Sequence, residues 1–271
     1  MEDEIIIRLR SLIKEKKLIP FIGTGFSATL KFPSWQDLIK SLAEKLDFDE
    51  DVFMQSGNSN FLQLAEYYQI KNSIGKLGNE LSKKMIINKS KLRNSLPHTL
   101  LVKMQPLSIY TTNYDEGIEA AFKLYNKKHI VIRNINDFQD SKDGSTLIYK
   151  FHGDFSDHSS LVLTESSYFD RMQFEDPLDI RLRSDILNNT LLFLGYSLND
   201  INIRFIFYKL DKIRKEIKKS NKSPSAIMIT FGVSEIQKEI LSNWNIEIID
   251  LSPLDKTKSL TDFLSKIIPK S

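Results

Sequence analysis

The segment LIPFIGTGFSATL, Leu18 to Leu30, joins an apolar run to two closely spaced glycines and then to a helical stretch. The apolar run predicts a buried strand, with Pro20 near its start, where a missing N–H is tolerated. Because glycine has no Cβ, a turn at Gly23 and Gly25 can come close to a phosphate, which the start of a helix also favours. A turn that merely needs positive φ explains the same glycines. The segment therefore indicates either an ordinary strand-to-helix turn or a pyrophosphate-binding loop.

The composition is that of an ordinary globular protein, with 41% hydrophobic and 27% charged residues in a chain of 271. The absence of cysteine excludes disulfides, thiolate zinc sites and a cysteine nucleophile, and four scattered histidines give little support for a metal site. A net charge of +3 does not indicate nucleic acid, and base-stacking aromatics interleaved with basic residues are not evident. The acidic start, MEDEIIIRLRSLIKEKK, is neither a secretion signal nor a membrane span. We predict a cytoplasmic protein that binds no metal, nucleic acid or membrane.

Hydrophobic periodicity predicts a helix from about residue 2 to 17 and a second one capped by Ser34 and Asp37. The apolar stripe of the second helix consists of Trp35, Leu38, Ile39, Leu42, Ala43 and Leu46. No convincing strand follows until about residue 104, so we expect a helical insert at approximately residues 36–104. Beyond it, strands alternate with helices, and several strands are continuous apolar runs, as in parallel sheets covered on both faces. The prediction is a single α/β domain over residues 1–271, with a Rossmann-like, mostly parallel sheet and helices on both faces.

Distinctive polar motifs follow four of the predicted strands, at the edge where open α/β sheets bind their ligands. The first, Gly23-Thr24-Gly25-Phe26-Ser27-Ala28, satisfies the loose dinucleotide fingerprint. The acidic residue that ordinary Rossmann dehydrogenases carry after their second strand is missing, so that class is disfavoured. The other three motifs are TTNYD at residues 111–115, FHGD at 151–154 and GYSLND at 195–200.

Each of these three motifs has a structural alternative. Asn113 and Asp115 can face a ligand together, but Asp115 can equally cap the helix that follows. His152 stands at a strand end before a glycine, and an imidazole with a pKa near ~6.5 suits a general base, although a lone histidine is more often structural. Gly195 and Ser197 can contact a phosphate or a ribose, or belong to a loop that caps the next helix.

In this order, the four motifs resemble those of the sirtuin superfamily, and most closely those of the bacterial sirtuin-like NAD hydrolases of anti-phage defence, the Thoeris effector type among them. The resemblance covers roughly residues 18–251. It implies a Rossmann-type sheet with NAD lying across the strand ends as the substrate. It departs from protein-deacetylating sirtuins in two respects, because the four zinc cysteines are absent and KFPSWQDLI stands where those enzymes carry an Asp-Phe-Arg segment.

The resemblance implies two catalytic residues: Asn113, orienting water or the nicotinamide ribose, and His152, acting as a base or as a ribose ligand. The implied NAD-binding residues are Gly23, Gly25 and Ser27 around the pyrophosphate, Gly195 and Ser197 on the adenosine side, and Thr24 and Asp115 with no more specific role.

The predicted activity is hydrolysis of the nicotinamide–ribose bond of NAD to nicotinamide and ADP-ribose, depleting NAD in anti-phage defence. An NAD-dependent protein deacylase and a non-catalytic sensor of NAD or ADP-ribose are the alternatives. Because uncontrolled loss of NAD kills the cell, we expect control by homo-oligomerisation or by a regulatory partner, of which an ATPase or an Argonaute-type protein are examples.

Overall fold

The computed structural model describes residues 2–56, 61–140, 144–197, 201–216 and 226–268. Seven parallel strands form one sheet in the order β3-β4-β2-β1-β5-β6-β7. The strands are β1 (Leu18–Ile22), β2 (Ser108–Thr111), β3 (His129–Ile132), β4 (Thr146–Lys150), β5 (Thr190–Leu194), β6 (Ala226–Thr230) and β7 (Ile246–Asp250). The predicted α/β, Rossmann-like class is confirmed.

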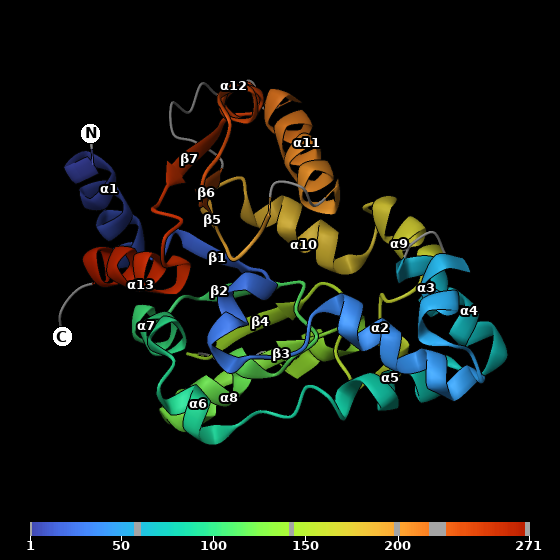
Figure 1. Ribbon diagram of the computed structural model, residues 1–271. Coiled ribbons are helices and arrows are strands. Elements are labelled where there is room, and N and C mark those ends of the chain that lie inside the picture. Colours follow the sequence, from blue (N-terminus) through green and yellow to red (C-terminus); the bar gives the residue numbers. More distant parts are fainter. Residues whose placement is uncertain (1, 57–60, 141–143, 198–200, 217–225, 269–271) are drawn as a thin grey trace.

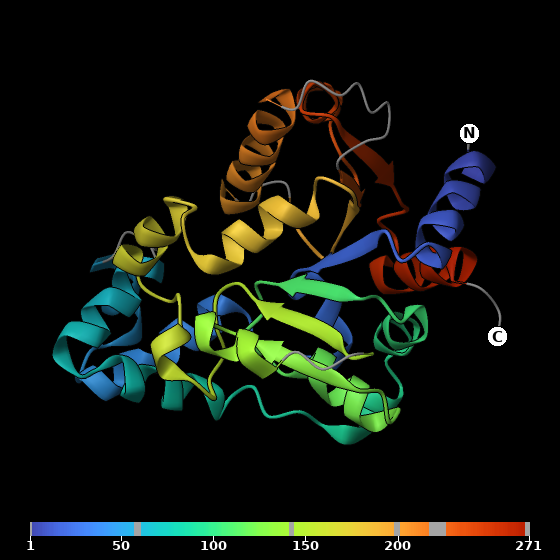
Figure 2. The same ribbon diagram turned by 180° about the vertical axis from the view of Figure 1, so that it is seen from behind.

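Helices cover both faces of the sheet (Figures 1 and 2). One face is packed by α1 (Glu2–Lys14), α6 (Lys89–Arg93), α7 (Leu96–Met104), α8 (Gly117–Leu124) and α13 (Lys256–Ile267). The other face is packed by α10 (Pro177–Asp185), α11 (Ile201–Glu216) and α12 (Glu235–Asn243). Alternation along β1 explains the division, since Leu18 and Ile22 join the first core while Ile19 and Phe21 join the second.

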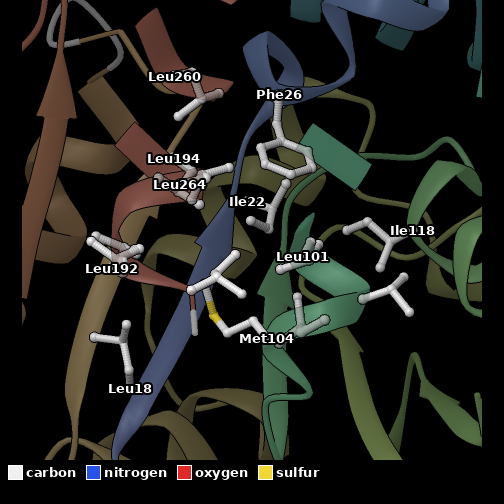
Figure 3. Packing of buried hydrophobic residues seen from close by; sticks show 14 of the residues in the cluster. Leu18, Ile22, Phe26, Leu101, Met104, Ile118, Leu192, Leu194, Leu260 and Leu264 are labelled. Carbon is white, nitrogen blue, oxygen red and sulfur yellow. The ribbon is translucent and has the colours of Figure 1, made fainter. Parts of the chain in front are cut away.

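The first core gathers side chains from segments that are far apart in the sequence. Figure 3 shows Ile22 of β1, Leu101 of α7 and Leu264 of α13 meeting in one cluster. Each of these three side chains is at most 1% exposed. Burial of apolar surface on this scale is the main term that holds the helices to the sheet.

The helices between β1 and β2 divide into two groups. A third core holds together α2 (Trp35–Ala43), α3 (Glu50–Ser56), α4 (Phe61–Lys71) and α5 (Ile74–Ser82), which lie together at one end of the molecule in both views. By contrast, α6 and α7 pack on the sheet. The predicted capping box at the start of α2 is present, since the hydroxyl of Ser34 accepts from the N–H of Asp37 at 3.1 Å. Of the predicted stripe, Leu38, Ile39, Leu42 and Ala43 are buried, Leu46 is half-buried, and the Trp35 side chain lies outside the described part of the structure.

The strand order places the motif-bearing loops where a Rossmann-type fold binds its ligand. From β1 the chain builds β2, β3 and β4 on one side, and after α9 (Glu165–Met172) and α10 it returns to form β5 on the other side of β1. The crevice beyond the carboxyl ends of β1 and β5 is therefore the topological switch point of the sheet.

Candidate functional site

The loops that follow β1 and β5 pack directly against each other. The N–H of Gly23 donates to the carbonyl of Leu194 at 2.8 Å, and the N–H of Gly25 donates to that of Gly195 at 2.9 Å. A Cβ added to Gly23 would lie 2.7 Å from the Gly195 carbonyl oxygen, and a Cβ on Gly25 would lie 2.9 Å from the same atom. The first two glycines of the motif are thus required by the close approach of two backbone segments. We call this contact the glycine joint.

Backbone angles at the glycine joint separate the two interpretations of the first motif. Gly195 has a positive φ of 77°, whereas Gly23 has a φ of −110° and Gly25 is not in the positive region either. The view that Gly23 and Gly25 need only a positive φ is therefore wrong. Their N–H groups donate to the last residue of β5 and to the residue after it, and the helical stretch that follows is a short 3₁₀-helix, η1 (Thr24–Leu30), rather than an α-helix.

A cavity of about 300 Å³ lies beside the glycine joint, at the carboxyl ends of β1, β5 and β6. Four of the predicted NAD-binding residues, Thr24, Gly25, Gly195 and Ser197, line it. Phe231, after β6, and Lys256, at the start of α13, form part of its wall. The remainder of the fourth motif, residues 198–200, lies outside the described residues. We call this space the switch-point cavity.

Asn113, in the second motif, is buried against the first motif, at 1% exposure. Its Nδ2 donates to the carbonyl of Gly23 at 3.3 Å and to Oγ of Ser27 at 3.4 Å. Its Oδ1 is buried and has no hydrogen-bond partner among the described residues. Because buried acceptors are rarely left unpaired in folded proteins, this oxygen is suited to receive a donor from water or a ligand.

Asp115 completes this network and lies just before the next helix. Its Oδ1 accepts from the N–H of Gly117, the first residue of α8, at 2.8 Å, although the N-cap position of α8 is Glu116 and not Asp115 as the capping alternative held. The same oxygen accepts from the hydroxyl of Ser27 at 3.4 Å. Burial raises the pKa of this carboxyl above its usual value, and the nearby ammonium of Lys150 opposes that rise. The structure thus brings together Gly23, Ser27, Asn113 and Asp115.

His152 lies beyond the end of β4 and faces a second, smaller cavity of about 30 Å³. Its ring packs edge-on against Tyr168, with centroids 5.1 Å apart, and its Nδ1 lies 3.4 Å from the Tyr168 hydroxyl. Burial, and secondarily the charge of Arg171, lower the pKa of His152 to about 3. This pKa is well below the value of ~6.5 on which the sequence-based argument for a general base relied. The imidazole is therefore neutral at pH 7.

The two predicted catalytic residues contact different surroundings. Asn113 bonds to the first motif, whereas His152 packs with Tyr168 and Arg171, and neither residue lines the switch-point cavity. Tyr114, the neighbour of Asn113, connects the two, since its ring centroid lies 6.1 Å from that of His152. The loop after β2 thus reaches both groups.

Two residues near His152 carry no signal in the sequence motifs. Tyr168 and Arg171 lie on α9, a segment that periodicity identifies only as a helix. The guanidinium of Arg171 stacks 4.3 Å from the centroid of Phe151 and pairs with Asp179 at 2.8 Å. Tyr168 and Arg171 could have been identified from the sequence only if α9 had been expected to pack against the end of β4.

Within the ranges that the structure describes, no group of three or more His, Cys, Asp or Glu side chains is placed to hold a metal ion. No helix in these ranges has the length and apolar character needed to cross a membrane.

Comparisons with known proteins agree with the geometry. Residues 107–249, just over half of the chain, match the family described as SIR2-like domain. The NAD(+) hydrolase ThsA of Acinetobacter baumannii (strain 532279) is 30% identical over 219 residues, which are 77% of this chain and 42% of that protein. The NAD(+) hydrolase ThsA of Bacillus cereus (strain MSX-D12) is 26% identical over 274 residues, covering 94% of this chain and 54% of that protein.

A third relative, the defense-associated sirtuin 2 of Bacillus subtilis, is 27% identical over 258 residues, which are 93% of this chain and 25% of that protein. The chain thus spans about half the length of the ThsA relatives and less of this one. The resemblance that the four motifs indicated is confirmed. With its parallel sheet, its motif-bearing strand ends and these matches in agreement, the chain belongs to the family of SIR2-like domains.

Proposed function

We propose that this chain hydrolyses NAD at the bond between nicotinamide and ribose, releasing nicotinamide and ADP-ribose, and that it depletes NAD in anti-phage defence. The observation that carries the proposal is the buried, unpartnered Oδ1 of Asn113 at the topological switch point, next to the glycine joint. Relatives named NAD(+) hydrolase support it.

The dinucleotide would lie along the carboxyl ends of the central strands. In this arrangement Gly195 and Ser197 hold the adenosine side in the switch-point cavity, and the loop at Thr24 meets the pyrophosphate. A volume of about 300 Å³ suits part of such a ligand rather than all of it. The nicotinamide ribose then extends toward Asn113, beyond the cavity.

The reaction breaks the C–N bond, and its electron pair neutralises the positive ring of the departing nicotinamide. A water molecule attacks the ribose carbon as positive charge develops there, and then loses a proton. Asn113 Oδ1 is placed to accept a hydrogen bond from that water or from a ribose hydroxyl, which fixes its geometry. With a pKa of about 3, His152 is better suited to accept a hydrogen bond from ribose than to store a proton at pH 7.

Asn113→Ala and His152→Ala test the assignment. We expect the wild-type chain to release nicotinamide and ADP-ribose from NAD alone, and each variant to lose on the order of 10²-fold or more in kcat while its circular dichroism spectrum is unchanged. Chromatography of the products gives the rate. Wild-type turnover in both variants would remove these residues from the mechanism.

The same assay separates the alternative functions. A deacylase releases nicotinamide only after an acylated peptide is added. A sensor binds NAD, as calorimetry would detect, and leaves it whole. Release of nicotinamide without peptide is the outcome that supports the hydrolase.

We further infer that residues 1–271 form a single domain, that the helical insert spans approximately residues 36–104 within it, and that its α2–α5 part covers the bound NAD. The supporting contact is made by Tyr114, the residue between Asn113 and Asp115 in the sequence. Its side chain is buried in the core of the α2–α5 helices. We also propose a cytoplasmic location, and control by self-association or by a partner such as an ATPase or an Argonaute-type protein. Light scattering combined with activity measurements over a range of protein concentrations tests self-association.

A further inference from the structure

A lysine is fully buried behind the candidate site. Lys150 is the last residue of β4, stands two positions before His152, and is 0% exposed. Removing an ammonium group from water is costly unless its charge and its N–H donors are matched by partners. The proposed chemistry makes no use of this residue, so its burial calls for another explanation.

The partners of Lys150 come from two neighbouring elements. Its Nζ donates to the backbone carbonyl oxygen of Asp115 at 2.7 Å. The same nitrogen lies 3.0 Å from Oε1 of Glu119 on α8, whose side chain is 4% exposed. Lys150 therefore ties the end of β4 to the loop after β2 and to the first turns of α8.

The tied loop is the one that carries Asn113. On one side, the Asp115 carboxylate accepts from Ser27 and Gly117. On the other, Lys150 holds the Asp115 carbonyl. The backbone at Asp115, two residues after Asn113, is thus held from both sides. If it were free to move, the carboxamide of Asn113 would move with it.

The charges around Lys150 do not by themselves require its hydrogen bond to the Asp115 carbonyl. Its ammonium opposes the rise of the Asp115 pKa and contributes to lowering the pKa of Asp154. Glu119 faces it as the directly paired acid. One cation thus serves several buried acids, but its short hydrogen bond is to an uncharged carbonyl, whose role is geometric.

We propose that Lys150 is a positioning residue for NAD hydrolysis: by holding the Asp115 carbonyl, it orients the loop at residues 113–115 and so aims the carboxamide of Asn113 at the reacting ribose. Glu119 neutralises the lysine and has no part in the aiming. This inference rests on the proposed function, since it assigns a role within that reaction.

The test compares two variants that separate the hydrogen bond from the ion pair. Lys150→Met/Glu119→Met replaces both charges by apolar side chains of similar size, a change that buried pairs often tolerate, and removes the bond to the Asp115 carbonyl. Glu119→Gln is the matched control, because it removes the ion pair and leaves that bond in place. Each variant is measured for melting temperature, for kcat and KM of nicotinamide release, and for hydrogen–deuterium exchange of the peptide covering residues 112–117.

We expect the double variant to lose about 10-fold or more in kcat with KM within about two-fold of wild type, because a misplaced group lowers turnover more than binding. Glu119→Gln should retain kcat within about two-fold. Exchange in residues 112–117 should rise in the double variant alone. If the double variant does not fold, Lys150→Arg replaces it, since a displaced donor should also lower kcat at constant KM.

Wild-type kcat in the folded double variant would overturn the proposal, as would an equal loss in Glu119→Gln or a change confined to KM. A wild-type chain that leaves NAD intact both alone and in a self-associated or partner-bound assembly refutes the proposed function instead. The exchange measurement then decides whether Lys150 holds the loop, and unchanged exchange in the double variant would reject that as well.

Discussion

Single residues at the glycine joint show what a sequence pattern can and cannot predict. The GTGFSA motif correctly marked a special turn after the first strand, because two glycines so placed are seldom accidental. Their physical reason was not predictable, because the atom that excludes a Cβ, the carbonyl oxygen of Gly195, is more than 160 residues away in the chain. The same holds for His152, whose lowered pKa depends on burial and on Arg171.

Gly195→Ala should be strongly destabilising. A Cβ there would lie 2.3 Å from the backbone nitrogen of Phe26, and the φ of 77° is unfavourable for alanine. Strain and overlap together should lower the free energy of unfolding by roughly 2 kcal/mol or more. The control is Gly75→Ala in α5, where the nearest atom is 3.5 Å away and alanine favours the helix. Urea unfolding measures both, and equal midpoints would contradict the account of the joint.

The positions of individual helices and strands along the chain were the features that the sequence predicted best. Ser34 and Asp37 located the start of α2, and the apolar run before Gly23 located β1, because capping and runs of apolar residues are local properties. Less predictable was which helices belong together. The helices before β2 look alike in sequence, yet α2–α5 form their own core and α7 packs on the sheet, a difference made by tertiary contacts.

Ser34→Ala tests the predicted cap. Loss of the hydroxyl that accepts from the Asp37 N–H should destabilise the protein by about 1 kcal/mol, the usual value for an N-cap serine. Ser90→Ala on α6 is the comparison, because the cap of that helix is provided by the side chain of Asn88. Chemical unfolding should show a shift for the first variant and little change for the second. A shift of equal size in both would argue against the cap.

At the scale of the whole molecule, the parallel sheet follows from the alternation of strands and helices, but the strand order and the site do not. Thr24 and Ser197 belong to one cavity only because β1 and β5 are neighbours, and His152 faces another because β4 lies two strands away from β1. Motif order could indicate that these residues share a sheet edge. It could not indicate which of them share a cavity.

Two buried histidines should reduce the stability of the fold in mild acid. Burial lowers the pKa of His98 to about 4, and burial with Arg171 lowers that of His152 to about 3. Below a pH of ~6.5 the unfolded chain binds protons that the folded chain does not, so each histidine removes up to about 1.4 kcal/mol per pH unit as the pH falls toward its folded pKa. Above pH ~6.5 both states are neutral and this dependence vanishes.

Urea unfolding at pH 7.5, 6.5 and 5.5 provides the measurement, chosen at steps of about one pH unit. A His98→Gln/His152→Gln variant is the control, and its stability should vary less with pH over this range than that of the wild type. Parallel curves would show that the two histidines titrate normally in the folded protein.

The glycine joint also has a consequence for synthesis in the cell. The loop after the first strand takes its shape from hydrogen bonds to Leu194 and Gly195, so it cannot adopt that shape on a ribosome that has not yet released those residues. A polypeptide interrupted earlier would carry the glycine motif and the asparagine without a formed dinucleotide groove. Under the proposed function, such a truncated product should leave NAD intact.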